Sequence, residues 1–187
     1  MMYAVELFFD EKLEHGIRMI WDGLKSERIT PNMADIKGLR PHLTLGVYDA
    51  ALPAEEFVDA FQTFAGGLRS FNVNFETISF FSSSSVVFTP PRMTKDLFTL
   101  HQNYYQALGS YNEHAHELYL PGRWVPHCTL AMELNNGQLV DTLRYCSEHF
   151  QAMNGRLTEI CVEKMEVNDE GHVSERLFSV PLKGERE

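Results

Sequence analysis

One short pattern, Pro-His-x-Thr-Leu, occurs twice in this chain, at residues 41–45 and again at residues 126–130. At average residue usage, such a pattern arises by chance in roughly one in a thousand chains of this length. Because side chains alternate between the two faces of a strand, the histidine and the threonine of each copy are expected to share one face. The repeat therefore predicts two similar strands, whose polar faces carry His42 and Thr44 in one and His127 and Thr129 in the other.

The other predicted elements follow the same repeat. Apolar periodicity predicts four helices, at 11–25, 53–64, 94–108 and 138–150, and seven strands, at 3–9, 42–48, 71–81, 86–88, 127–132, 157–167 and 173–181. Loops or turns are expected at 31–38, 82–85 and 168–171. The 85 positions that separate His42 from His127 also carry helix 53–64 onto 138–149 and strand 71–81 onto 156–166. This agreement indicates a tandem duplication.

A duplicated chain of this kind predicts an α+β fold. We expect a bilobal molecule with two pseudo-symmetric βαβαββ-like lobes, whose antiparallel sheets face each other across a central cleft. The whole chain, 1–187, is interpreted as one domain, with lobe one at about 1–85 and lobe two at about 86–187.

The charge of the chain limits its partners. Sixteen Lys and Arg residues against 26 Asp and Glu residues leave a net charge of −10. Proteins that coat duplex DNA or RNA neutralise many phosphates, so this acidic balance argues against that class of protein. A pocket for one small anion needs only a few local donors and stays compatible with the composition.

The cysteines and the N-terminus indicate where the protein works. Cys128, Cys146 and Cys161 form no C-x-x-C pair, which is typical of free thiols in a reducing compartment. The first residues lack the basic segment of a signal peptide, and no apolar stretch is long enough to span a membrane. We therefore expect a cytoplasmic protein that does not enter a membrane.

Two facing imidazoles suit phosphoryl transfer. A neutral histidine removes a proton from the attacking oxygen, and a protonated one delivers a proton to the leaving oxygen. The threonine hydroxyls can donate hydrogen bonds to non-bridging phosphate oxygens. Small residues, Gly46 and Ala131, follow next on the expected polar faces and would leave room for a ligand. No metal and no cofactor is needed in this scheme.

These motifs resemble the two H-h-T-h motifs (h, hydrophobic) of the 2H phosphoesterase superfamily, and the chain is most similar to its 2'-5' RNA ligase group. The resemblance implies a bilobal fold, with the motifs facing each other across a cleft. It implies metal-independent action on 2',3'-cyclic phosphates, 2'-5' linkages or related cyclic phosphates. It places the catalytic histidines at His42 and His127 and the phosphate-binding hydroxyls at Thr44 and Thr129. Several relatives carry a basic residue after the second motif, where this chain has Met132.

The resemblance suggests three functions. The first is a phosphodiesterase that hydrolyses a small nucleotide, or the cyclic phosphate at an RNA end. The alternatives are a 2'-5' RNA ligase and a non-catalytic module that binds a cyclic nucleotide or an RNA end. No duplex nucleic acid is expected as a partner, and protein partners are left open.

Other residues near the motifs allow two interpretations each. Arg40 precedes the first motif and Arg123-Trp124 precedes the second. They could attract phosphate and stack on a base, or they could be ordinary loop charges and a partly buried indole. Tyr48 shares its parity with His42 and could line the rim of the cleft, although a sheet-edge aromatic is the alternative.

One further histidine pair is a candidate metal site. His114 and His116 form an H-x-H between Glu113 and Glu117, which could ligate a metal if the segment is extended. No third ligand stands at a telling spacing, and a solvated loop is the alternative interpretation.

Overall fold

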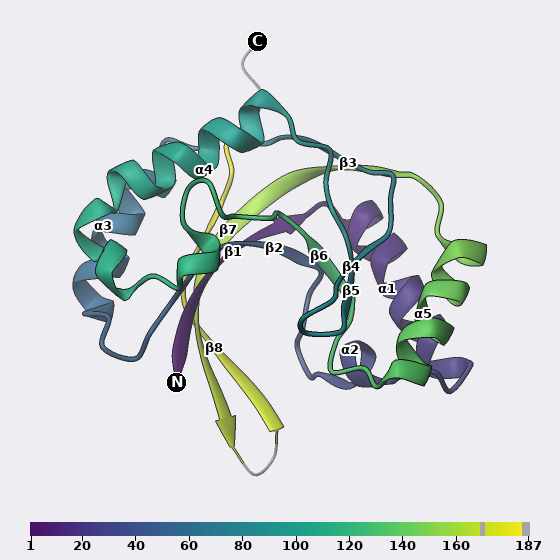
Figure 1. Cartoon of the computed structure of the whole chain (residues 1–187). Coiled ribbons are helices and arrows are strands. Elements are labelled where there is room, and N and C mark those ends of the chain that lie inside the picture. Colours follow the sequence, from purple (N-terminus) through teal and green to yellow (C-terminus); the bar gives the residue numbers. More distant parts are fainter. Residues whose placement is uncertain (169–170, 185–187) are drawn as a thin grey trace.

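The structure is a computed structural model that describes residues 1–168 and 171–184 (Figure 1). Its helices are α1 (Glu11–Ser26), α2 (Asn32–Asp35), α3 (Ala54–Ala65), α4 (Lys95–Ala107) and α5 (Asn136–His149), with 3-10 helices η1 (Gly109–His114) and η2 (Glu117–Tyr119). Its strands are β1 (Met2–Phe9), β2 (His42–Tyr48), β3 (Phe71–Phe75), β4 (Ser79–Phe81), β5 (Val86–Thr89), β6 (Cys128–Ala131), β7 (Met153–Asn168) and β8 (Gly171–Pro181). The expected turn at 168–171 includes two residues outside the described ones.

The α+β prediction is confirmed, and the predicted helices and strands occur close to their expected bounds. Two local predictions are wrong. The expected loop at 31–38 contains the short helix α2, and the expected single strand at 71–81 is two strands, β3 and β4. The break between them has a structural cause, because the chain passes there from one sheet to another.

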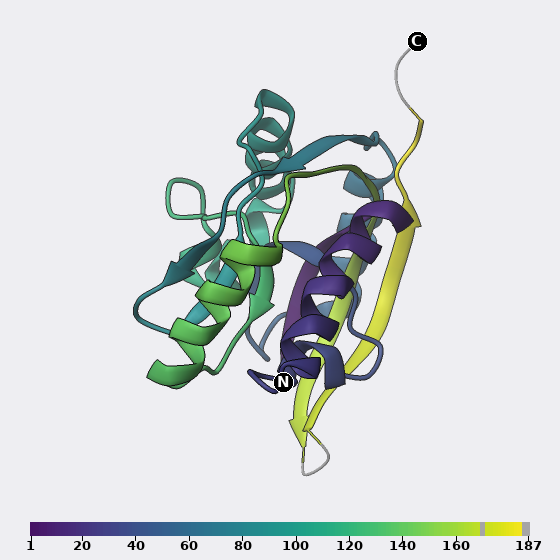
Figure 2. The ribbon, with the colours of Figure 1, turned by 90° about the vertical axis from the view of Figure 1, so that its right-hand side faces the viewer.

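The strands form two antiparallel sheets. The larger sheet has the order β2-β1-β7-β3, with β8 paired to β7, and the smaller has the order β4-β5-β6. Figure 1 shows α3 and α4 on one side of the molecule and α1 and α5 on the other. Helix α3 contacts β8, α1 contacts β6 and β7, and α5 contacts β5. Helices α1 and α5 also touch each other, and they lie side by side in Figure 2.

The first half of the sequence contributes β4 to the smaller sheet, and the second half contributes β7 and β8 to the larger one. Strand β7, from the second half, pairs with β1 from the first, and β4, from the first half, pairs with β5 from the second. Strand β3, from the first half, also pairs with β7 from the second. The sheets therefore do not divide the chain at residues 85 and 86, where the sequence analysis places the lobe boundary, because β7 and β8 lie in the sheet of β1 and β2.

The helix α1 shows how the sequence builds these layers. The side chain of Asp10 caps the helix by accepting a hydrogen bond from the amide of Leu13 at 2.9 Å. The apolar residues of the helix then recur on one face, which is buried: Leu13, Ile17, Ile20, Trp21 and Leu24. The second carboxylate oxygen of Asp10 accepts a hydrogen bond from the amide of Arg156 in β7 at 2.6 Å. One side chain therefore starts the helix and ties it to the sheet.

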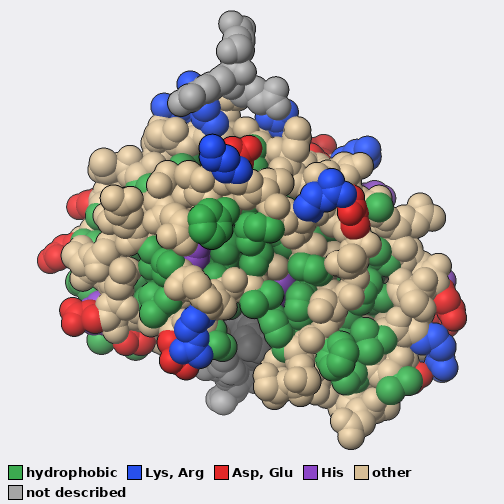
Figure 3. All heavy atoms as spheres, turned by 45° about the horizontal axis from the view of Figure 1, so that its top comes forward, with side chains coloured by type: hydrophobic (Ala, Val, Ile, Leu, Met, Phe, Trp, Pro, Cys, Tyr) green, Lys and Arg blue, Asp and Glu red, His purple; other side chains and the backbone are tan. Residues whose placement is uncertain are grey.

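The buried residues of both sheets join in one hydrophobic core, which includes Leu43 and Leu45 of β2 and Leu130 of β6. On the surface, Figure 3 shows one face on which apolar side chains gather in the middle, with histidines set among them and most charged side chains toward the edges. Among the described residues, no helix combines the length and the apolarity that crossing a bilayer requires.

Candidate active site

The two Pro-His-x-Thr-Leu motifs lie on neighbouring strands of different sheets. His42 and Thr44 are on β2. His127 directly precedes β6 and Thr129 is on it, and β6 contacts β2. In both copies the histidine and the threonine are half-buried, while the residue between them, Leu43 or Cys128, is fully buried. The alternation along the strand thus separates a polar face from the core, as the sequence predicts.

Both imidazoles are held by the same hydrogen bond. Nδ1 of His42 lies 2.7 Å from the carbonyl oxygen of Arg40, and Nδ1 of His127 lies 2.7 Å from that of Val125. Because a carbonyl oxygen only accepts, each Nδ1 carries the hydrogen and donates it. In the neutral ring, Nε2 then has a free lone pair, so Nε2 is the atom that each histidine offers for proton transfer.

Each of the two tryptophans of the chain donates a hydrogen bond to the backbone of one motif. The indole nitrogen of Trp21, in α1, donates to the carbonyl oxygen of Thr129 at 3.1 Å. That of Trp124, in the loop before β6, donates to the carbonyl oxygen of Thr44 at 2.9 Å. Each indole therefore fixes the motif that belongs to the other half of the sequence. Trp21 was not among the residues that the sequence analysis singled out, because nothing in its local pattern distinguishes it from a core tryptophan.

Trp124 has a structural partner on its ring. The ring stacks on His101 of α4, with centroids 4.0 Å apart and planes 3° from parallel. Burial lowers the pKa of His101 to about 4, so this imidazole is neutral near pH 7. Its Nε2 lies 2.9 Å from the carbonyl oxygen of Tyr119. His101 thus covers one face of the Trp124 ring. This contact agrees with the alternative interpretation from the sequence, in which Trp124 is a partly buried indole.

The two catalytic candidates differ in their surroundings. Oε1 of the buried Glu6 lies 3.5 Å from Nε2 of His42. The ring of His127 lies 5.1 Å from the ring of Phe81 and 5.1 Å from that of Phe88, between centroids. Burial lowers the pKa of His127 against the opposing bond to Val125, and the charge of a protonated His42 lowers it further. The pKa of His127 therefore responds, as the smallest of these causes, to the charge of a residue in the other sheet.

The arginines beside the motifs already have acidic partners. Arg40 forms ion pairs with Glu14 at 2.7 Å and Glu159 at 2.6 Å, and its guanidinium lies 4.1 Å from the ring centroid of Phe8. Arg123, which is exposed, pairs with Glu117 at 2.6 Å. Because these carboxylates neutralise the guanidinium charges, a phosphate would have to compete with them for either arginine.

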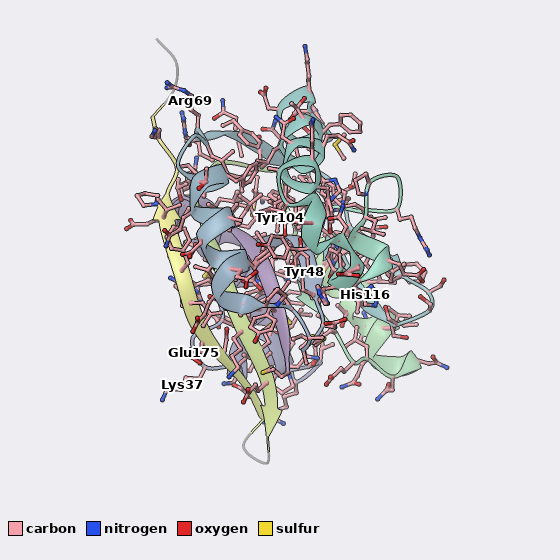
Figure 4. All side chains as sticks on the ribbon, turned by 90° about the vertical axis from the view of Figure 1, so that its left-hand side faces the viewer. Lys37, Tyr48, Arg69, Tyr104, His116 and Glu175 are labelled. Carbon is pink, nitrogen blue, oxygen red and sulfur yellow. The ribbon has the colours of Figure 1, made fainter. Side chains whose placement is uncertain are left out.

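Tyr48 does not line the site, which corrects the sequence-based interpretation. The pairing of β1 with β2 shifts register between Val5 and Glu6, so that Leu45 is an extra residue, a β-bulge. The bulge reverses the parity of the residues that follow, and Tyr48 is 1% exposed. Its hydroxyl lies 2.5 Å from that of Tyr104, and Figure 4 shows the two tyrosines inside the molecule.

The second motif carries the same bulge. The pairing of β5 with β6 shifts register between Val87 and Phe88, which leaves Leu130 as the extra residue. Gly46 and Ala131, which follow the bulged leucines, are both buried. A Cβ added to Gly46 would lie 2.8 Å from the hydroxyl oxygen of Tyr104. The expectation that these small residues leave space for a ligand is wrong, since tyrosine fills the space at Gly46.

Met132, directly after β6, has structural partners. Its side chain packs against the hydrophobic core, and its carbonyl oxygen accepts a hydrogen bond from the side-chain amide of Asn32. At the position after the second motif, this chain therefore has an apolar contact.

The H-x-H histidines have separate partners, and the segment that holds them extends the edge of β2. Nδ1 of His114 lies 3.3 Å from a carboxylate oxygen of Asp49. Nδ1 of His116, which is labelled in Figure 4, accepts a hydrogen bond from the amide of Leu118. Ala115 bridges to Tyr48, and the amide of His116 donates to the carbonyl oxygen of Val47 at 2.7 Å. Within the described part of the chain, no third ligand joins these two histidines.

A different group of potential ligand atoms lies beside His42. One atom each of Glu6, Cys161 and Glu163 lie within 4.8 Å of one another. Burial raises the pKa of the Cys161 thiol, and the nearby charges of Glu6 and Glu163 raise it further. Glu163 is also paired with Arg176 at 3.1 Å. A protonated thiol is a poor metal ligand, so we interpret this group as part of the charge network of the sheet.

The α+β fold, with one H-x-T motif on β2 and the other at β6 beside it, is that of the two-histidine phosphoesterases, the 2H superfamily. The sequence also matches a family, described as the 2'-5' RNA ligase superfamily, over residues 18–169. The chain belongs to this family. A comparison with curated protein sequences finds no match.

Solved structures with the same fold include proteins of two bacteria. The protein TT0787 of Thermus thermophilus is 16% identical, with a TM-score of 0.63 over 100% of both chains. E. coli LigT complexed with 3'-AMP is 16% identical, with a TM-score of 0.60 over 97% of this chain and 98% of the other. LigT complexed with NADP+ is 18% identical, with a TM-score of 0.57 over 96% and 98%. At these identities, the likeness establishes the fold.

Proposed function

We propose that this protein is a metal-independent phosphodiesterase that hydrolyses 2',3'-cyclic phosphates or 2'-5' linked nucleotides with His42 and His127 as acid and base. The observation that carries the proposal is the repeated imidazole geometry, in which both Nδ1 atoms donate to a carbonyl oxygen and both Nε2 atoms are presented for proton transfer. Membership of the family supports the reaction class, and the nucleotide complexes of LigT support a small nucleotide as ligand.

The proposed reaction needs one proton on the pair of histidines. One neutral Nε2 takes a proton from the attacking water as its oxygen bonds to phosphorus. The bond from phosphorus to the leaving ribose oxygen breaks, and the second, protonated Nε2 gives that oxygen its proton. The hydroxyls of Thr44 and Thr129 donate to the non-bridging oxygens, whose negative charge grows in the transition state.

Ligation of RNA ends is the second candidate. It would use the same groups, with a 5'-hydroxyl in place of water, and the cyclic phosphate would supply the bond energy. The net charge of −10 and the paired state of Arg40 and Arg123 favour a small substrate over long RNA. Three free, buried cysteines agree with a reducing compartment, and we propose the cytoplasm.

A direct assay tests the proposal. Purified protein in EDTA is given 2',3'-cyclic AMP and a 2'-5' dinucleotide, together with His42→Ala, His127→Ala and, as the matched control, His15→Ala, which removes an exposed histidine of α1. We expect turnover that is lost in the first two variants and kept in the control. Tight binding without turnover would instead support the binding module. Activity that EDTA alone abolishes would contradict the metal-independent mechanism.

A further inference from the structure

The two histidines of the site share one hydrogen-bond geometry but have chemically different neighbours. A carboxylate oxygen of Glu6 lies 3.5 Å from Nε2 of His42, and the Glu6 side chain is only 7% exposed. Around His127, in the part of the chain that the structure describes, there is no carboxylate within ion-pair distance, and two phenyl rings flank the imidazole instead. The two histidines therefore have similar positions and unequal electrostatic surroundings.

We propose that Glu6 assigns the roles of the two histidines: its carboxylate keeps the proton on His42, which acts as the general acid, while His127 acts as the general base. Glu6 is in this view a positioning residue, because it acts on the reaction only through the protonation of His42. The inference rests on the proposed function and deepens it, because the motif geometry alone leaves the two roles interchangeable.

The distance between Glu6 and His42 suits this role. A carboxylate close to an imidazole favours its protonated form. At 3.5 Å, however, the contact is longer than an ordinary N–H···O hydrogen bond of about 2.7–3.2 Å. The carboxylate can therefore act through its charge, while the proton on Nε2 stays available to the leaving oxygen of a substrate. A hydrogen bond of ordinary length would instead direct that proton at Glu6.

The strand register holds Glu6 in this place. Glu6 of β1 is paired across the sheet with Thr44 of β2 on one side and with Cys161 of β7 on the other. Phe8, two residues on, pairs with His42 and shares the face of Glu6. The acid is therefore on a central strand, where its side chain projects to the same face as the first motif.

The charges around Glu6 come from several parts of the chain. Burial raises the pKa of Glu6, and the charge of Glu163 raises it further, whereas the charges of His42, Arg176 and Arg40 lower it. The charge of Glu6 in turn raises the pKa of Cys161 and of Tyr119, where burial is the larger cause. In this setting a protonated His42 favours the carboxylate form of Glu6. A proton on His127 is opposed both by burial and by that on His42.

The first test needs no substrate. The imidazole NMR signals are assigned with His42→Ala and His127→Ala and followed from about pH 5 to pH 9 in the wild type, in Glu6→Gln and in Glu76→Gln. The last is the matched control, since Glu76 is an exposed carboxylate paired with Arg92. We expect His127 to lose its proton at a lower pH than His42. In Glu6→Gln, we expect the His42 transition to move to lower pH than in the wild type, because the neighbouring negative charge is removed.

The control is expected to match the wild type, and circular dichroism verifies that Glu6→Gln is folded. A His42 transition that is the same in Glu6→Gln and wild type would overturn the inference, as would loss of the His42 proton before that of His127. Because this readout needs no turnover, it stands apart from the outcome of the hydrolysis assay.

The second test separates acid from base by the leaving group. In a cyclic phosphate analogue with sulfur in place of the leaving ribose oxygen, the leaving group is a thiolate. A thiolate needs little help from a general acid. For His42→Ala, we expect the loss of activity relative to wild type to be about tenfold smaller on this analogue than on the oxygen substrate. We expect His127→Ala to lose both activities alike. The opposite pattern would overturn the assignment, whereas absence of wild-type turnover on every cyclic phosphate would instead contradict the proposed function.

Discussion

Thr44 and Thr129 occupy equivalent places in the two motifs, and both are held through the backbone. The carbonyl oxygens of these residues accept bonds from the two tryptophans, so the hydroxyl groups are positioned without taking part in that contact. If the hydroxyls bind the non-bridging oxygens, each stabilises part of the charge that develops in the transition state.

Replacing either threonine by valine removes the hydroxyl and keeps the branched shape. We expect Thr44→Val and Thr129→Val each to lower kcat by about 10²-fold. Thr→Ser at the same positions, the matched control, keeps the hydroxyl and should retain most activity. Equal losses in the serine and valine variants would show that packing, and not the hydroxyl, is what matters; steady-state kinetics on 2',3'-cyclic AMP decide this.

Gly46 is the residue at which the first bulge meets the core. A Cβ there would lie 2.8 Å from the hydroxyl oxygen of Tyr104 and 3.1 Å from that of Tyr105, both of which are buried. We expect Gly46→Ala to lower the free energy of unfolding by about 1–3 kcal/mol, because the tyrosines must shift in a packed core. Gly184→Ala, where a Cβ meets nothing within 4 Å, is the control in urea denaturation. Equal stabilities of the two variants would contradict this account.

At the scale of the element, Asp10 joins a helix to a sheet. Its carboxylate caps α1 and also accepts the amide of Arg156 in β7. We expect Asp10→Ala to cost about 2–3 kcal/mol, because it removes a cap and also leaves a half-buried amide without that partner. Thr94→Ala, which removes the cap of α4 alone, should cost about 1 kcal/mol. Thermal and urea unfolding measure both, and an equal cost would show that the bond to β7 adds nothing.

The elements themselves follow largely from the sequence. The strand pattern of 42–48 and the apolar spacing of Leu13, Ile17, Ile20 and Leu24 predict β2 and α1 correctly, because periodicity reports which face is buried. The division of 71–81 into β3 and β4 does not follow, since both pieces have the same apolar character. Only the partner strands, β7 and β5, distinguish them.

At the scale of the whole molecule, His101 connects parts that lie far apart in the sequence. It is 2% exposed on α4, stacks on Trp124 and is bonded to the carbonyl oxygen of Tyr119. Burial lowers its pKa to about 4, so the unfolded chain binds a proton at a higher pH than the folded one. The stability that its neutral form provides is complete above about pH 6.5 and is lost as the pH falls toward 4.

As the pH falls from about 6.5 to about 4, the unfolded chain binds a proton at His101 that the folded chain does not. We expect this to lower the free energy of unfolding by about 2 kcal/mol. His101→Gln has no titrating group, and its stability should depend less on pH over that range, whatever its stability at pH 7. His15→Gln, on an exposed position, should keep the wild-type slope. Urea unfolding at several pH values measures the slopes, and an unchanged slope in His101→Gln would refute the prediction.

The sequence by itself determined the fold class and most element bounds, and it placed the histidine and threonine of each motif on one strand face, because the repeat and the alternation of side chains are properties of the chain. The tertiary structure decided the rest. The bulges at Leu45 and Leu130 turned Tyr48, Gly46 and Ala131 into the core, since one extra residue reverses parity and its position depends on the partner strand. The exchange of β4 and β7 between sheets is likewise a matter of long-range pairing. The neighbours that distinguish His42 from His127 come from β1, β4 and β5, which no local pattern places beside the motifs.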